Sequence, residues 1–235
     1  MVRPWIEYLV AKLYPPTCVL CGAPGDQGLD LCLGCLGDMP HNRHCCSRCA
    51  LPLPPEHQAG NVCGECQRRP PPFDRCHAAF RYEDPVPMLV SAAKFRSRLN
   101  IARLLGECLL RSLRERGEAL PTLIIPVPLH PRRLRERGYN QALELARPVS
   151  RGLGLPLDTK SCIRVQSTTP QAGLEKQARR RNVRGAFRAV RPPSARHVAL
   201  IDDVVTTGST VSELTKVLHR AGVERVDVWS AARTE

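Results

Sequence analysis

The chain has 235 residues, of which 43% are hydrophobic and 24% are charged. This length and composition are typical of a globular protein with one domain and a small module, or with two modest domains, and they exclude a largely disordered chain. No stretch approaches about eighteen uninterrupted apolar residues, so we expect no membrane-spanning helix. Lys and Arg number 35 against 22 Asp and Glu, which gives a net charge of +13 and favours negatively charged partners. Aromatic residues make up only 4%, which disfavours a broad base-stacking surface.

The first predicted element is a short apolar helix near the N-terminus. Residues 5–14 are mostly apolar, but Glu7 and Lys12 interrupt them and no small-residue cleavage site follows. We therefore interpret this stretch as a docking helix and not as a signal peptide. Without an export signal, the protein is expected in the cytoplasm, where thiols stay reduced.

Cysteine pairs dominate the next fifty residues. Eight of the twelve cysteines form four C-x-x-C pairs: Cys18 and Cys21, Cys32 and Cys35, Cys46 and Cys49, Cys63 and Cys66. Two such pairs complete a tetrahedral site, so the sequence predicts two Cys₄ zinc ribbons. A Cys₄ site has no open coordination position, and both zinc ions are expected to be structural. Spacing alone leaves sequential and crossed grouping of the pairs open.

A stiff proline run separates these ribbons from the rest of the chain. The sequence Gln-Arg-Arg-Pro-Pro-Pro at residues 67–72 is typical of a linker. We predict a double zinc ribbon with its short helix over residues 1–70 and a second domain over residues 74–235. The remaining cysteines, Cys45, Cys76, Cys108 and Cys162, lack paired spacing and are interpreted as apolar fillers.

Strands and helices alternate in the second domain. Strands are expected over 78–83, 122–127, 197–201 and 225–231, and helices over 86–116 with a break near Ser97, over 140–153 and over 209–221. Pro148 is expected to kink or split the second of these helices. Residues 164–196 are polar and rich in Arg, and we expect a loop there. This order predicts an α/β fold with a parallel sheet flanked by helices.

A phosphate site is predicted where the strand at 197–201 meets the helix at 209–221. Asp202 and Asp203 follow the strand, and a turn rich in hydroxyl groups then opens the helix. The free N–H groups of the turn, the helix dipole and the hydroxyls favour a bound phosphate, and Gly208 permits close approach of its backbone. The hydroxyls and the glycine are those of Thr206, Thr207, Gly208, Ser209 and Thr210. The two carboxylates would repel phosphate, so we expect them to face a hydroxylated group such as a ribose.

This segment resembles the phosphoribosyl-pyrophosphate (PRPP) loop of type I phosphoribosyltransferases, and every position of the D-D-x-x-T-T-G-x-T pattern is matched. The resemblance implies that Asp202 and Asp203 hold the ribose hydroxyls and that residues 206–210 hold the 5-phosphate. It also implies two Arg-rich segments around pyrophosphate. The first, after the strand at 122–127, carries Arg132, Arg133, Arg135 and Arg137, and the second, a mobile hood, carries Arg179 and Arg180. Mg²⁺ is expected to arrive with PRPP. The alternatives are a basic surface turn and a plain basic loop.

Zinc ribbons ahead of R-G-Y-N-Q at 137–141, T-P-Q-x-G-L at 169–174 and R-R-R-N-V-R-G-A-F at 179–187 resemble the ComF family of bacterial competence proteins. The resemblance implies a phosphoribosyltransferase-like protein that acts in DNA uptake and natural transformation. Its acceptor substrate cannot be derived from the residues. Lys94 and Arg96 could reach the pocket, but we interpret them as charges on a helix surface. The alternative is a non-catalytic protein of the competence machinery. Such a protein would bind single-stranded DNA or dock a helicase or another uptake component.

Overall fold

The computed structural model describes residues 15–54, 56, 60–95, 98–117, 119–167 and 183–235. Contacts divide the chain into two compact units, residues 1–40 and residues 41–235. The expected N-terminal helix lies outside the described residues. In the smaller unit, the helix α2 (Leu33–Gly37) begins at Cys32, whose Sγ accepts a hydrogen bond from the N–H of Cys35. This division places the third and fourth C-x-x-C pairs in the larger unit, and the boundary expected at residues 70–74 stays a prediction.

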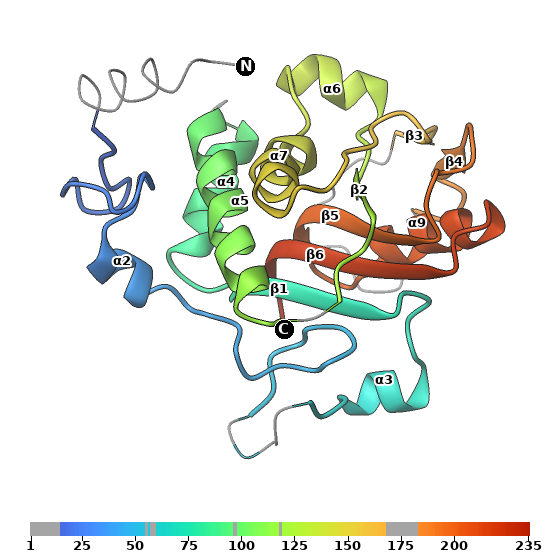
Figure 1. Cartoon of the computed structure of the whole chain (residues 1–235), viewed down its shortest axis with the longest axis horizontal. Helices are drawn as coiled ribbons and strands as arrows, with labels where there is room; N and C mark the ends of the chain where they lie inside the picture. The colour runs from blue at the N-terminus through green and yellow to red at the C-terminus, as the bar shows by residue number, and fades with distance from the viewer. Residues whose placement is uncertain (1–14, 55, 57–59, 96–97, 118, 168–182) are drawn as a thin grey trace. The chain divides into compact units, whose positions relative to one another are not determined.

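The larger unit is an α/β structure (Figure 1). Its elements are α3 (Gly64–Arg68), β1 (Arg75–Arg81), α4 (Val86–Phe95), α5 (Leu99–Arg114), β2 (Leu123–Pro126), α6 (Pro131–Arg137), α7 (Gln141–Leu153), β3 (Cys162–Arg164), β4 (Phe187–Ala189), β5 (His197–Val205), α9 (Ser209–Arg220) and β6 (Arg225–Arg233). β1, β2, β5 and β6 correspond to the four expected strands, whereas β3 and β4 were not expected. Within the segment expected as a loop, β4 pairs antiparallel with β3.

A four-stranded parallel sheet in the order β1-β6-β5-β2 forms the centre of this unit. Alternate side chains of a strand point to opposite faces. On one face, Val198 and Leu200 of β5 share a buried cluster with Leu214 and Leu218 of α9. Ala199 and Ile201 alternate with them and are equally buried. Apolar strands buried on both faces explain why the sequence reads there as continuous hydrophobic runs.

Helices α5 and α7 pack side by side (Figure 1). They come so close that a Cβ at Gly106 would lie 2.4 Å from the carbonyl oxygen of Leu145 and 2.5 Å from Cγ of Pro148. A larger residue at Gly106 would therefore force the helices apart. Pro148 does not split α7, which continues to Leu153, so of the two expected outcomes only a kink remains. The break expected near Ser97 is confirmed by the separate helices α4 and α5.

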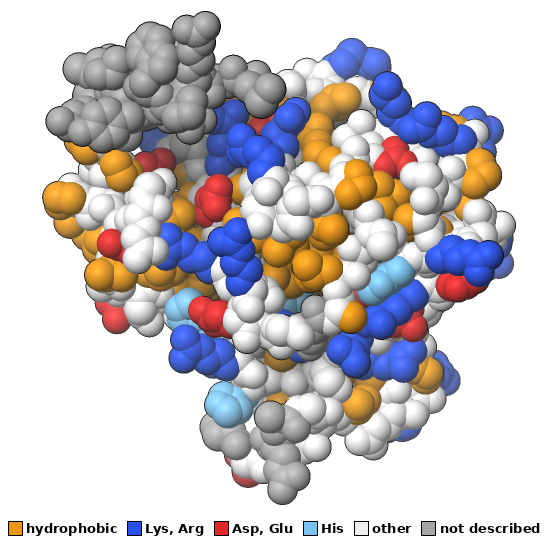
Figure 2. Space-filling model, viewed as in Figure 1, with side chains coloured by type: hydrophobic (Ala, Val, Ile, Leu, Met, Phe, Trp, Pro, Cys, Tyr) orange, Lys and Arg blue, Asp and Glu red, His pale blue; other side chains and the backbone are white. Residues whose placement is uncertain are grey.

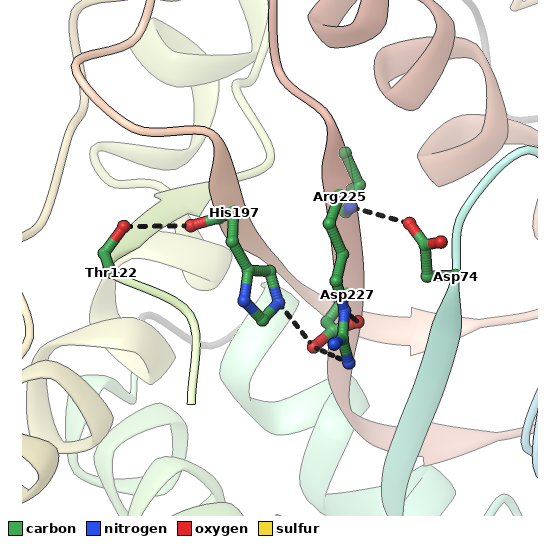
Figure 3. A network of polar contacts seen from close by, with 6 residues as sticks. Asp74, Thr122, His197, Arg225 and Asp227 are labelled. Carbon is green, nitrogen blue, oxygen red and sulfur yellow. Dashed lines mark hydrogen bonds and ion pairs between the residues drawn. The ribbon is translucent and has the colours of Figure 1, made fainter. Parts of the chain in front are cut away.

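Polar contacts fix the amino ends of the central strands (Figure 3). Asp227 is buried, and its carboxylate contacts Nε2 of His197 at 2.8 Å and Nε of Arg225 at 3.4 Å. Asp74 accepts a hydrogen bond from the N–H of Val226 at 2.9 Å. These contacts lie at the beginning of β5 and β6 and do not involve the carboxyl ends of the same strands.

The expected fold class is confirmed, since a parallel sheet flanked by helices is combined with an N-terminal region that carries the paired cysteines. In the described parts of the chain, no helix has the length and apolar character that crossing a membrane requires.

Candidate functional site

The carboxyl ends of β5 and β2 meet at one edge of the sheet because the two strands are parallel neighbours. At the end of β5, the chain turns through Thr206–Gly208 into α9. Gly208 has a φ of 70°, a conformation that L side chains rarely adopt. The hydroxyls of Thr207 and Ser209 lie 2.7 Å apart and brace the turn. The first N–H groups of a twelve-residue helix therefore open toward this edge.

Asp202 and Asp203 lie inside β5, not after it as expected from the sequence, because pairing with β6 continues to Val205. Desolvation and the neighbouring charge of Asp203 raise the pKa of Asp202 to about 7, although Lys94 acts in the opposite direction. Oδ1 of Asp202 accepts the N–H of Asp203 at 2.9 Å. Among the described residues, Oδ2 of Asp202 has no hydrogen-bond partner, so one carboxylate oxygen can accept a ligand hydroxyl.

Lys94 reaches this acidic pair from the end of α4. Its Nζ lies 2.7 Å from Oδ2 of Asp203, and both side chains are largely buried. Burial would lower the pKa of Lys94, but the charge and hydrogen bond of Asp203, together with the charge of Asp202, raise the pKa overall. The interpretation of Lys94 as a surface charge was therefore wrong. Only the packing of α4 beside the sheet brings it to Asp203, and Arg96 lies outside the described residues.

The Arg-rich segment after β2 is the short helix α6. His130 caps it by accepting the N–H of Arg132, and Pro131 occupies its first turn. Arg132 contacts Glu136 at 2.9 Å, whereas Nη1 of Arg137 donates to Gln141 at 3.0 Å. Burial and the neighbouring Arg137 lower the pKa of Arg133. Four of the six expected Arg residues thus lie on α6, which follows the strand that adjoins β5, while Arg179 and Arg180 lie outside the described residues.

Arg164 is a further cation near the acidic pair, and it was not predicted from the sequence. Its guanidinium lies 5.4 Å from the ring centroid of Phe187. Burial lowers the pKa of Arg164, Asp202 opposes this shift, and Arg133 adds to it. These mutual effects show that Arg133, Arg164 and Asp202 share one electrostatic environment. Arg164 lies on β3 and Phe187 on β4, so the antiparallel pairing of these two strands brings the two side chains together.

The paired cysteines form two clusters, and the grouping is sequential. One cluster is Cys18, Cys21, Cys32 and Cys35, and the other is Cys46, Cys49, Cys63 and Cys66. In each cluster all four Sγ atoms lie within 4.8 Å of one another. The Sγ atoms of Cys21 and Cys32 are 3.7 Å apart, as are those of Cys49 and Cys63. Zn–S bonds of about 2.3 Å in a tetrahedron require sulfur atoms about 3.8 Å apart, so both clusters fit zinc.

The pKa values of the thiols in the second cluster also favour a bound cation. A hydrogen bond with Cys49 lowers the pKa of Cys46 to about 4, and the same contact raises the pKa of Cys49. Once one thiolate has formed, its negative charge disfavours deprotonation of the neighbouring thiols. A zinc ion removes this conflict and holds all four sulfur atoms as thiolates. The chain therefore carries two Cys₄ zinc-ribbon sites.

A cavity of about 700 Å³ lies between the second cluster and the phosphate turn. Cys49, Cys63 and Cys66 line one side, and Thr206–Ser209 line another. Its charged side chains are Arg69, Lys216 and Arg233 together with Glu65, Glu213 and Glu235. Because the two signs are equally represented, this cavity does not favour a polyanion. The proline run, instead of acting only as a linker, forms part of its wall.

Sequence comparisons place relatives along nearly the whole chain. The double zinc ribbon domain family matches residues 9–67. The chain is 38% identical over 225 residues to the DNA utilization protein YhgH of Escherichia coli O157:H7, which covers 94% of this chain and 98% of the relative. It is 37% identical over 213 residues to Competence protein F of Haemophilus influenzae, with 86% and 90% covered.

Solved structures are similar to part of the chain. The glutamine PRPP amidotransferase of B. subtilis has a TM-score of 0.39 at 18% identity over 57% of this chain, which spans only 27% of that protein. The purine phosphoribosyltransferase of Pyrococcus horikoshii has a TM-score of 0.32 at 20% identity, with 56% of this chain and 80% of that chain covered.

The relatives at 37–38% identity cover 86–94% of this chain. Together with the double zinc ribbon match, they show that this chain belongs to the ComF family, alongside the DNA utilization protein YhgH and Competence protein F.

Proposed function

We propose that this chain binds Mg²⁺-PRPP, or a related phosphoribosyl group, at the carboxyl edge of β5 and acts in the bacterial cytoplasm in DNA uptake and utilization. One observation carries the proposal: two adjacent carboxylates lie near the carboxyl end of β5, and a turn rich in N–H and hydroxyl groups then leads into a helix. This arrangement provides a hydroxyl-binding end and a phosphate-binding end a few residues apart. The names of the relatives support the cellular role.

In this proposal each end of the site has its own task. Asp202 and Asp203 accept hydrogen bonds from the ribose hydroxyls. The turn at 206–210 binds the 5-phosphate through backbone N–H groups and side-chain hydroxyls. Arg132, Arg133 and Arg137 of α6, with Arg179 and Arg180, neutralise the leaving pyrophosphate. Mg²⁺ arrives bound to PRPP and reduces the negative charge of the pyrophosphate.

Lys94 offsets part of the negative charge of the acidic pair. Its ammonium group lies 2.7 Å from Oδ2 of Asp203. The proposed reaction is attack of a nitrogen nucleophile on the anomeric carbon of the ribose, with pyrophosphate leaving. The chain contributes position and electrostatics, because no described side chain in the site is placed as a covalent nucleophile. None of the described contacts in the site selects a particular acceptor molecule.

Replacement of Asp202 by asparagine tests the site directly. The amide cannot accept hydrogen bonds as a charged group does, and such bonds contribute about 1.5–3 kcal/mol. We therefore expect Asp202→Asn to weaken Mg²⁺-PRPP binding by roughly 10- to 100-fold in calorimetric titration. Asp203→Asn should weaken it similarly.

The control is Glu224→Gln, which changes an exposed carboxylate that contacts Arg196 at 2.7 Å on the surface. It should bind Mg²⁺-PRPP as the parent protein does. Absence of binding by the parent protein, or equal affinity of the Asp202 variant, would refute the proposed site.

A second function, binding of single-stranded DNA, is favoured by the distribution of charge. Lys and Arg side chains are spread over the visible face of the molecule, including the part that carries α6 (Figure 2). Arg132 and Arg135 are exposed there. Basic side chains that contact phosphates make binding strongly dependent on salt.

Salt titration of oligonucleotide binding tests this second function. We expect fluorescence anisotropy to show affinity for a single-stranded oligonucleotide that falls steeply with salt. The double variant Arg132→Gln/Arg135→Gln should reduce the slope of log K against log salt by about 1 to 2. An unchanged slope would exclude α6 from the contact, and binding insensitive to salt would exclude phosphate contacts altogether.

A further inference from the structure

Arg233 connects the phosphate turn with the second cysteine cluster. It is the last residue of β6, it is 8% exposed, and it is paired in register with Val205 of β5. Its Nε donates to the carbonyl oxygen of Cys49 at 3.0 Å. Its Nη1 donates to the carbonyl oxygen of Val205 at 3.2 Å and also to those of Thr206 and Thr234.

The partners of this buried guanidinium are unusual. In the part of the chain that the structure describes, Arg233 forms no ion pair, and its hydrogen bonds go to backbone carbonyls. A buried cation is costly unless its donors are satisfied, so these carbonyls are held firmly in place. One of these carbonyls belongs to a zinc-ligand residue, Cys49. Two others belong to Val205, the last residue of β5, and to Thr206, the first residue of the phosphate turn.

The geometry of the peptide bond carries this constraint across the turn. The peptides that follow Val205 and Thr206 are trans, and in a trans peptide the C=O and N–H bonds point in opposite directions. Because Arg233 holds both carbonyl oxygens, the N–H groups of Thr206 and Thr207 must point away from it. Two donors of the proposed 5-phosphate site are therefore oriented before a ligand arrives.

We propose that Arg233 is a positioning residue that couples the second cysteine cluster to the phosphate turn. The metal-bound cluster fixes the Cys49 carbonyl, Arg233 transmits that position, and the turn presents its N–H groups in the binding geometry. By thermodynamic reciprocity, a phosphate group at the turn then stabilises the metal-bound form of the second cluster. The ligand part of this inference rests on the proposed function, whereas the coupling between cluster and turn does not.

Hydrogen exchange in the full-length, zinc-loaded protein tests the coupling without any ligand. We expect Arg233→Met to accelerate amide exchange in residues 206–209 by roughly tenfold, while exchange in residues 198–201 of β5 changes little. Arg233→Lys keeps the charge but loses the planar fork, so it should restore only part of the protection. Arg225→Met, at the opposite end of β6, is the matched control and should leave the turn unchanged.

Release of zinc to a chromogenic chelator provides the reciprocal measurement. Arg233→Met should speed release of one of the two zinc ions by roughly fivefold or more and leave the other unaffected. Equal exchange in residues 206–209 and equal zinc release in Arg233→Met and parent protein would overturn the coupling.

Calorimetry with Mg²⁺-PRPP separates the two proposals, since a parent protein that binds no PRPP but shows the coupling contradicts only the proposed function. Where the parent binds PRPP, Arg233→Met should bind it about tenfold more weakly.

Discussion

The variant Cys46→Ser is expected to lose one of two zinc ions and to lower the free energy of unfolding of the larger unit by several kcal/mol. Cys46 is fully buried, and its Sγ accepts the N–H of Cys63 at 3.3 Å, so it joins two halves of the cluster. This cluster lies in the unit of residues 41–235 that also contains the sheet. Loss of its metal should therefore lower the main thermal transition, measured by calorimetry, with zinc content from elemental analysis.

Two controls separate metal loss from the loss of a thiol. Cys45→Ser changes the adjacent cysteine, which belongs to neither cluster of the described residues, and it should retain both zinc ions. Cys21→Ser should also lose one zinc ion, but from the unit of residues 1–40, and should leave the main transition nearly unchanged. A parent protein without zinc, or a main transition that Cys46→Ser does not shift, would contradict the structural role of the second cluster.

Asp202→Asn is expected to stabilise the ligand-free protein above neutral pH, although it weakens PRPP binding. The pKa of Asp202 is raised to about 7 from an ordinary value of 3.8, so the folded protein binds a proton that the unfolded chain releases between these pH values. Stability contributed by this group is therefore lost as pH rises through that interval. Asparagine resembles the protonated carboxyl and avoids this loss.

The size of the effect follows from the same linkage. Between about pH 5.5 and about pH 8, the stability of Asp202→Asn relative to the parent should increase by about 2 kcal/mol. Thermal unfolding should show this as an increase in the relative Tm of about 4–8 °C. Asp203→Asn provides the contrast, because it removes the partner of Lys94 and should lower stability. If the difference in stability between Asp202→Asn and the parent does not depend on pH, the pKa of Asp202 is not raised in the folded protein.

The two cysteine clusters illustrate how much local spacing determines. A C-x-x-C turn brings two sulfur atoms together within four residues, so the ligands and their tetrahedral chemistry could be predicted from the sequence. Which pairs combine depends on how the intervening segments fold, and the sequential grouping became clear only from the sulfur positions. The placement of the second cluster in the larger unit depends equally on contacts between distant residues.

The phosphate turn was likewise determined by its own residues. A strand, two acids, a hydroxyl-rich turn and a helix are contiguous, and local conformational preferences are sufficient to predict them. The end of β5 was misplaced because pairing with β6, a partner more than twenty residues away, extends the strand through Asp202 and Asp203. The register between strands is a tertiary property, and the sequence of one strand does not contain it.

The sequence by itself determined the order of the four main strands and of the helices α4, α5, α7 and α9, the paired cysteines, and the acidic and hydroxyl groups of the proposed site, because each depends on residues close together in the chain. Only the tertiary structure brought Lys94 to Asp203, Arg164 into the environment of Asp202, and Arg233 between Cys49 and the phosphate turn. These contacts join residues separated by 27 to 184 positions. Long side chains such as Lys and Arg are favourable on any exposed surface, so their sequence surroundings do not reveal which of them the packing buries against an acid or a carbonyl.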